Sequence, residues 1–114
     1  MMKTIEVKNT DARENLTTIR ACLVKAVKDG DKEVCIFSTL FFVKGNLDRV
    51  KTEISSQLGS WCYVNSSRPS FFCGFMMTGL EVQFLYNEDE KELLISRILS
   101  LFSGSWPFAE NKKG

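Results

Sequence analysis

Apolar and polar residues alternate at the start of the chain and then repeat at helical spacing. The alternation over residues 4 to 8 predicts a short strand. Asp11 follows, and Glu14 three residues later completes a capping-box pattern, so we expect a helix to begin there and to end at Asp29-Gly30. Its apolar stripe consists of Leu16, Ile19, Leu23, Ala26 and Val27.

A second strand and helix follow in the same order. Residues 33 to 44 are rich in β-branched and aromatic side chains and are apolar at both alternating positions, which suits a strand covered on both faces. Gly45-Asn46 breaks this run, and Asn46 is expected to cap a helix that Gly59 ends. One face of this helix carries Leu47, Val50, Ile54 and Leu58.

Three further strands are predicted over residues 61 to 65, 71 to 77 and 80 to 86. With Thr78-Gly79 as a two-residue turn, the last two strands form a hairpin in which one face is wholly apolar. The other face is mixed, so we expect another surface to cover part of it. That mixed face holds Phe72, Met76 and Leu85.

The chain then predicts a final helix and a short tail. Asn87 is expected to cap a helix whose acidic first turn suits the helix dipole. Its apolar side chains spread over roughly 160° of arc, which predicts burial against the sheet or another chain. These side chains are Leu94, Ile95, Ile98, Leu99, Leu101 and Phe102.

This element order, β-α-β-α-β-β-β-α, predicts an α+β sandwich with a mixed sheet and helices packed on one or both faces. We expect a single domain over residues 1 to 103, followed by a tail over residues 104 to 114. Trp106 and Phe108 in that tail either fold back onto the domain or anchor a partner.

Composition narrows the possible chemistry. The 114 residues include no histidine, which excludes catalytic triads and dyads built on histidine and mixed Cys/His zinc sites within one chain. The four cysteines form no CxxC pair and are expected to be buried thiols. There is no Gly-rich phosphate loop. We therefore expect neither enzymatic activity nor a cofactor or metal.

The first functional hypothesis is a protein-interaction module, a small regulator or inhibitor that binds a protein and forms a homodimer. The N-terminus lacks the apolar run of a signal peptide and no segment is long enough to span a bilayer, so a soluble cytoplasmic protein without a membrane partner is expected. Met and aromatic side chains are enriched at interface centres. The residues expected to bind protein are Phe72, Met76, Leu85, Trp106 and Phe108.

The alternative is a nucleic-acid-binding domain. Helical spacing places Arg13, Arg20 and Lys28 on one flank of the first helix, where a basic stripe can follow phosphates. The loop over residues 65 to 70 adds Arg68 beside several hydroxyl groups. Lys and Arg outnumber Asp and Glu by only 15 to 14, so such binding would need a local patch.

Overall fold

The computed structural model describes residues 2–103. These residues form three helices and six strands. The predicted α+β class and element order are confirmed. In chain order the elements are β1 (Lys3–Val7), α1 (Ala12–Asp29), β2 (Glu33–Ser38), α2 (Asn46–Leu58), β3 (Cys62–Ser66), β4 (Ser70–Phe72), β5 (Phe75–Met77), β6 (Leu80–Phe84) and α3 (Lys91–Leu99).

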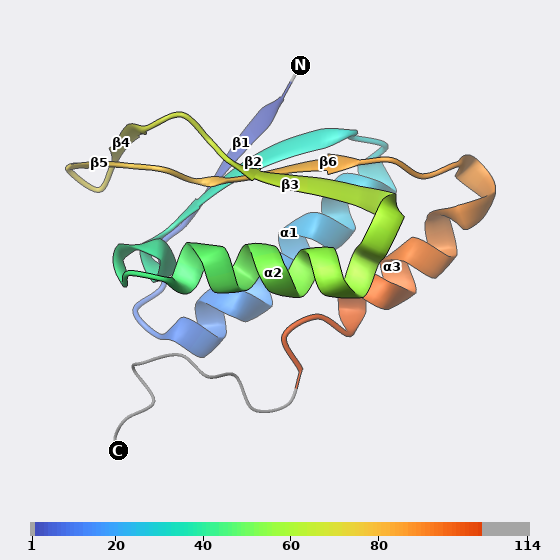
Figure 1. Ribbon diagram of the computed structural model, residues 1–114, viewed down its shortest axis with the longest axis horizontal. Helices are drawn as coiled ribbons and strands as arrows, with labels where there is room; N and C mark the ends of the chain where they lie inside the picture. The colour runs from blue at the N-terminus through green and yellow to red at the C-terminus, as the bar shows by residue number, and fades with distance from the viewer. Residues whose placement is uncertain (1, 104–114) are drawn as a thin grey trace.

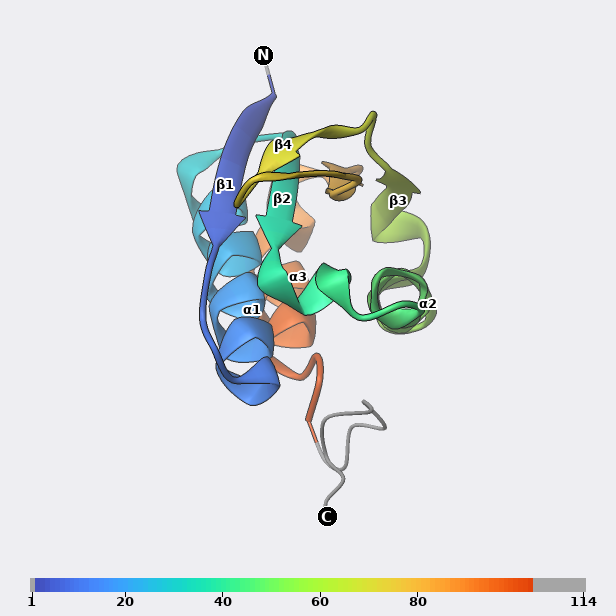
Figure 2. The ribbon, with the colours of Figure 1, turned by 90° about the vertical axis from the view of Figure 1, so that its left-hand side faces the viewer.

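Four of these strands form a mixed sheet in the order β1-β2-β6-β3. β1 and β2 run parallel with α1 as their connection, whereas β6 lies antiparallel to both β2 and β3. Figure 1 shows α1, α2 and α3 together on one side of this sheet, and Figure 2 shows the same arrangement from one end. Within residues 2–103, the four-stranded sheet therefore has a single layer of helices on one face and no helix on the other.

The core lies between the sheet and the helix layer. Alternate residues of the two central strands face the helices, for example Val34 and Ile36 of β2 and Val82 of β6, all fully buried. The stripe predicted for α1 is buried throughout. The fully buried large side chains are Ile19, Leu23, Ile36, Ile54, Leu80, Leu94, Ile98, Leu101, Val27, Val34, Val50 and Val82.

Local signals set the ends of α1 as predicted. The Asp11 carboxylate accepts a hydrogen bond from the Glu14 amide at 3.2 Å. Gly30 ends the helix with φ of 82°, a left-handed conformation that glycine adopts without a Cβ clash. For α2 the prediction that Asn46 is the cap was wrong. Gly45 is the N-cap, and the buried Asn46 instead donates its side-chain amide to the Leu40 carbonyl at 3.1 Å.

The predicted hairpin between residues 71 to 77 and 80 to 86 was wrong. The predicted first strand of that hairpin folds back on itself, so β4 pairs with β5 and Phe72 lies opposite Phe75. Cys73 and Gly74 form the turn with φ of 53° and 83°, as a two-residue hairpin turn of this type requires. Thr78-Gly79 is no turn between paired strands, because β6 lies between β2 and β3.

The end of β2 and the buried face of α3 also differ in part from the prediction. β2 stops at Ser38, and residues Thr39–Phe42 form a 3-10 turn instead of further strand. In α3, Leu94 and Ile98 are buried as predicted, whereas Leu99 is 58% exposed and was wrongly placed in the buried arc.

Among residues 2–103, no helix is long and apolar enough to cross a membrane.

Candidate functional site

The hairpin of β4 and β5 stands at one end of the sheet and is held there by aromatic packing (Figure 1). Phe72 is only 2% exposed, and its ring lies 6.0 Å from the ring of Phe37, which belongs to the helix-free face of β2. Phe42 contacts both strands, with ring centroids 6.0 Å from Phe72 and 5.5 Å from Phe75. A second small core thus fixes the hairpin against the sheet.

The outer face of the same hairpin is apolar and exposed. Phe71 and Met76 lie directly opposite each other on this face and are 70% and 61% exposed. Phe75 is also 63% exposed, but it lies opposite Phe72 and therefore belongs to the other face of the hairpin, next to Phe42. Phe42 and Val43 of the neighbouring segment are exposed as well. We call this set the hairpin patch: Phe42, Val43, Phe71, Phe75 and Met76.

The exposed apolar area of the hairpin patch is that of a functional patch on a typical protein. With roughly 200 Å² for a full aromatic side chain, its three phenylalanines alone present about 350 Å² of apolar surface, divided between the two faces of the hairpin. The largest apolar patch of a monomer is usually about 300 to 600 Å² and often serves binding. The hairpin patch is therefore the candidate functional site.

Cations flank the hairpin patch. Lys8 Nζ lies 5.9 Å from the centroid of the Phe72 ring and forms an ion pair with Glu6 at 3.2 Å. Lys44 directly follows Val43, and Arg68 precedes β4 by two residues; both are exposed. The sequence near the patch is thus richer in basic than in acidic groups.

The residues predicted to bind protein do not form one surface. Met76 is exposed within the hairpin patch, but Phe72 is buried on the opposite face of the hairpin, so its expected exposure was wrong. Leu85 is exposed, but it follows the last residue of β6, whereas the hairpin precedes the first residue of that strand. The Leu85 amide donates a hydrogen bond to the Trp61 carbonyl at 2.7 Å. Trp106 and Phe108 lie outside the described residues.

Sequence reasoning missed most of the hairpin patch. Phe71 and Phe75 were assigned to the wholly apolar face of a hairpin around Thr78-Gly79, and Phe42 to the strand predicted over residues 33 to 44. Gly74 could have suggested a second possible turn at Cys73-Gly74, but the sequence does not favour it over Thr78-Gly79.

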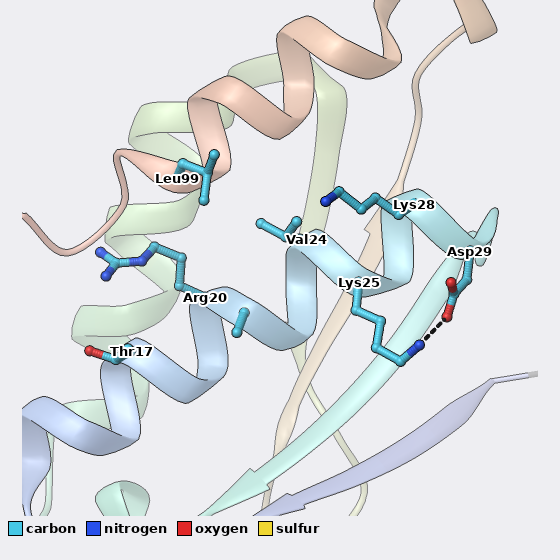
Figure 3. Close-up of a pocket in the computed structure, with 8 residues that line it drawn as sticks. Thr17, Arg20, Val24, Lys25, Lys28, Asp29 and Leu99 are labelled. Atoms are coloured by element: carbon cyan, nitrogen blue, oxygen red, sulfur yellow. Dashed lines mark hydrogen bonds and ion pairs between the residues drawn. The ribbon is translucent and has the colours of Figure 1, made fainter.

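The residues predicted to contact nucleic acid are divided between two parts of the fold. Arg20 and Lys28 line a groove between α1 and α3 (Figure 3), whereas Arg13 does not line it. Arg20 donates from Nη1 to the Leu101 carbonyl at 2.6 Å, so its guanidinium is engaged within the chain. Arg68 lies in the loop between β3 and β4, apart from the helix layer.

A pocket of about 360 Å³ lies where β1 and β2 end and α1 and α2 begin. Ligands often bind at such strand ends in α/β folds. Here, however, the buried Asn15 accepts from the Asn9 amide and donates to its carbonyl, both at 3.2 Å. Thr39 also donates to the Asn9 carbonyl, at 2.8 Å. These polar groups hold the loops around the pocket together.

The prediction that the cysteines are buried holds for Cys35 and Cys62, Cys22 is partly buried, and the prediction was wrong for Cys73. Burial raises the pKa of the Cys62 thiol to about 11, and burial also raises the pKa of Cys22 and of Cys35. Cys73 differs because it is exposed at the hairpin turn. Within the described part of the chain, no three cysteine or carboxylate side chains lie together in a way that could hold a metal ion.

The chain matches no family model, no curated protein and no solved structure in the comparisons with known proteins. Function is therefore inferred from the chemistry of the surfaces described above.

Proposed function

We propose that this chain is a protein-interaction module without catalytic activity of its own, which binds another protein through the hairpin patch. The observation that carries this proposal is the pairing of an exposed apolar face, Phe71 with Met76, on a hairpin whose other face is anchored by the buried Phe72. Because β4 and β5 are paired, the backbone that carries these side chains is already in place, which lowers the entropy lost on binding. By occupying a partner's surface the module would act as a regulator or inhibitor.

The partner we propose is a protein with an apolar cleft bordered by acidic side chains. The apolar cleft would accept Phe71 and Met76, and the acidic border would match the exposed Lys44, which directly follows Val43 of the patch. Charges at the edge of an interface mainly raise the association rate and improve selectivity. A second copy of this chain is the homodimeric version of the same proposal. Free thiols at all four cysteines fit a reducing compartment such as the cytoplasm.

Single-stranded nucleic acid is the competing ligand, since exposed aromatic rings next to cations also stack on bases. The two ligands differ in their salt dependence. Binding through phosphates weakens steeply as ionic strength rises, whereas apolar burial is nearly insensitive to it. Retention of a mixed pool of DNA and RNA at low salt, with loss at high salt, would favour the nucleic-acid reading.

The direct test replaces Phe71 by a photo-crosslinking phenylalanine derivative in cells that express the full chain. We expect a discrete protein crosslink that disappears in a Met76→Glu background. The matched control places the same crosslinker at Leu93, which is 53% exposed on α3 and lies away from the hairpin. Equal crosslinking from both positions, or none from Phe71, would contradict the proposal.

Light scattering tests the homodimer version. If the partner is a second copy, the mass of the unmodified chain rises with concentration and the Phe71→Glu, Met76→Glu double variant stays at the mass of one chain. A Leu93→Glu variant should behave like the unmodified chain. Circular dichroism of each variant verifies that it has folded.

A further inference from the structure

A groove of about 480 Å³ lies between α1 and α3, on the surface of the helix layer that faces away from the sheet (Figure 3). Ala21, Val24 and Leu99 form an apolar floor, and Leu99 is 58% exposed there. An exposed leucine between two helices leaves apolar surface in water, so covering it would be favourable.

The rim of this groove is basic. Lys25 is paired with Asp29 at 2.9 Å, and Arg20 donates to the Leu101 carbonyl. Lys28 projects over the groove (Figure 3) and forms no ion pair within residues 2–103. The groove therefore suits an occupant that combines apolar side chains with a negative charge.

The chain itself carries such a segment directly beyond the described part. The bond between Arg20 and Leu101 holds the turn after α3 beside the groove, and Ser103 follows two residues later. The next residues bring Trp106 and Phe108, and then the acidic Glu110. Lys112 and Lys113 follow Glu110, so only residues 104–110 match the apolar floor and the basic rim of the groove.

The available chain length also fits. Between Arg20 and Lys28 the groove follows eight residues of α1, or about 12 Å. Trp106 stands five residues after Leu101 and so reaches up to about 17 Å from it when extended. The groove thus lies within reach of Trp106.

We propose that residues 104–110 dock in the groove between α1 and α3, where Trp106 and Phe108 cover Ala21, Val24 and Leu99. The docked segment brings Glu110 to the basic rim near Lys28. This proposal is independent of the proposed function, because it concerns the helix layer and not the hairpin patch.

The experiment uses Trp106 as its own probe in the full chain. Trp61 is the other tryptophan, so a Trp61→Phe background leaves Trp106 as the sole emitter. We expect emission shifted to the blue of free tryptophan and a several-fold smaller acrylamide quenching constant. Leu99→Asp and, separately, Ala21→Glu should return both values toward those of free tryptophan, since each places a charge on the groove floor.

The matched control is Leu93→Asp, because Leu93 is exposed to nearly the same extent on the same helix but does not line the groove. It should leave Trp106 emission unchanged. Emission like free tryptophan in the background protein would overturn the proposal, as would equal shifts from Leu93→Asp and Leu99→Asp. Protection that vanishes on dilution would also overturn it, because the segment would then occupy a second copy.

Discussion

Arg20 of α1 donates a hydrogen bond from Nη1 to the carbonyl oxygen of Leu101 at 2.6 Å, across 81 positions of sequence. The bond joins the middle of the first helix to the turn that follows the last one. It also gives a hydrogen-bond partner to a carbonyl in the turn just beyond α3. A residue whose spacing suggested phosphate binding therefore has a structural role.

Replacing Arg20 by Ala should lower the free energy of unfolding by about 1 to 2 kcal/mol, because a half-buried charged hydrogen bond is lost. Urea unfolding measures this difference. Arg13→Ala is the control, since Arg13 is exposed on the same helix, and should change stability by less than about 0.5 kcal/mol. Equal losses in the two variants would mean that the bond to Leu101 contributes nothing.

Replacing Gly79 by Ala should destabilise the fold by about 1 to 3 kcal/mol through overpacking. An added Cβ would lie 2.7 Å from the Ile36 carbonyl oxygen and 3.1 Å from the Phe37 ring, where the backbone of β2 cannot easily yield. Thermal unfolding followed by circular dichroism measures the loss. The neighbouring Thr78→Ala should be much milder, and a Gly79→Ala protein as stable as the unmodified one would contradict the close approach.

Replacing Phe42 by Ala should loosen the hairpin more than the rest of the fold. It removes two ring contacts, with Phe72 and Phe75, each worth about 0.5 to 1.5 kcal/mol. Because β4 pairs with β5, we expect faster hydrogen exchange at the hairpin amides while those of β2 keep their protection. Val43→Ala, the adjacent exposed position, should leave both sets unchanged. Uniformly faster exchange would show that the hairpin is not a separate unit.

The buried Cys62 thiol should make stability fall at alkaline pH. Burial raises its pKa to about 11 in the folded chain, from an ordinary value near 9, so the folded state keeps a proton that the unfolded state has lost. The stabilising effect of the neutral thiol is complete below pH 9 and is lost as the pH rises through 11. Urea midpoints measured between pH 8 and 11 should fall more steeply for the unmodified chain than for Cys62→Ala. Parallel slopes would contradict the raised pKa.

Local signals in the sequence were sufficient for the elements that local contacts define. The ends of α1 follow from Asp11 and Gly30, whose backbone and side-chain groups act within one turn of the helix. The helical stripe of α1 likewise predicted its buried face. The stripe could not predict that α3 lies beside α1. The groove beside Lys28 therefore became apparent only in the structure.

The hairpin could not be predicted because two turn dipeptides compete within seven residues. Thr78-Gly79 loses only because β6 pairs with β2 and β3, which lie far away in sequence. The choice matters for function, since a turn at Cys73-Gly74 puts Phe72 and Met76 on opposite faces of the hairpin. The same sequence thus gains a buried anchor and an exposed patch in place of one mixed face.

β4 and β5 pair with each other and not with the four-stranded sheet, so the hairpin is hydrogen-bonded as a separate insertion between β3 and β6. Changes at Phe71, Phe75 or Met76 leave the register of the central strands intact. The fold is consequently a natural scaffold for loop grafting: the hairpin tip can be diversified to select new binding partners while the helix-covered core supplies the stability.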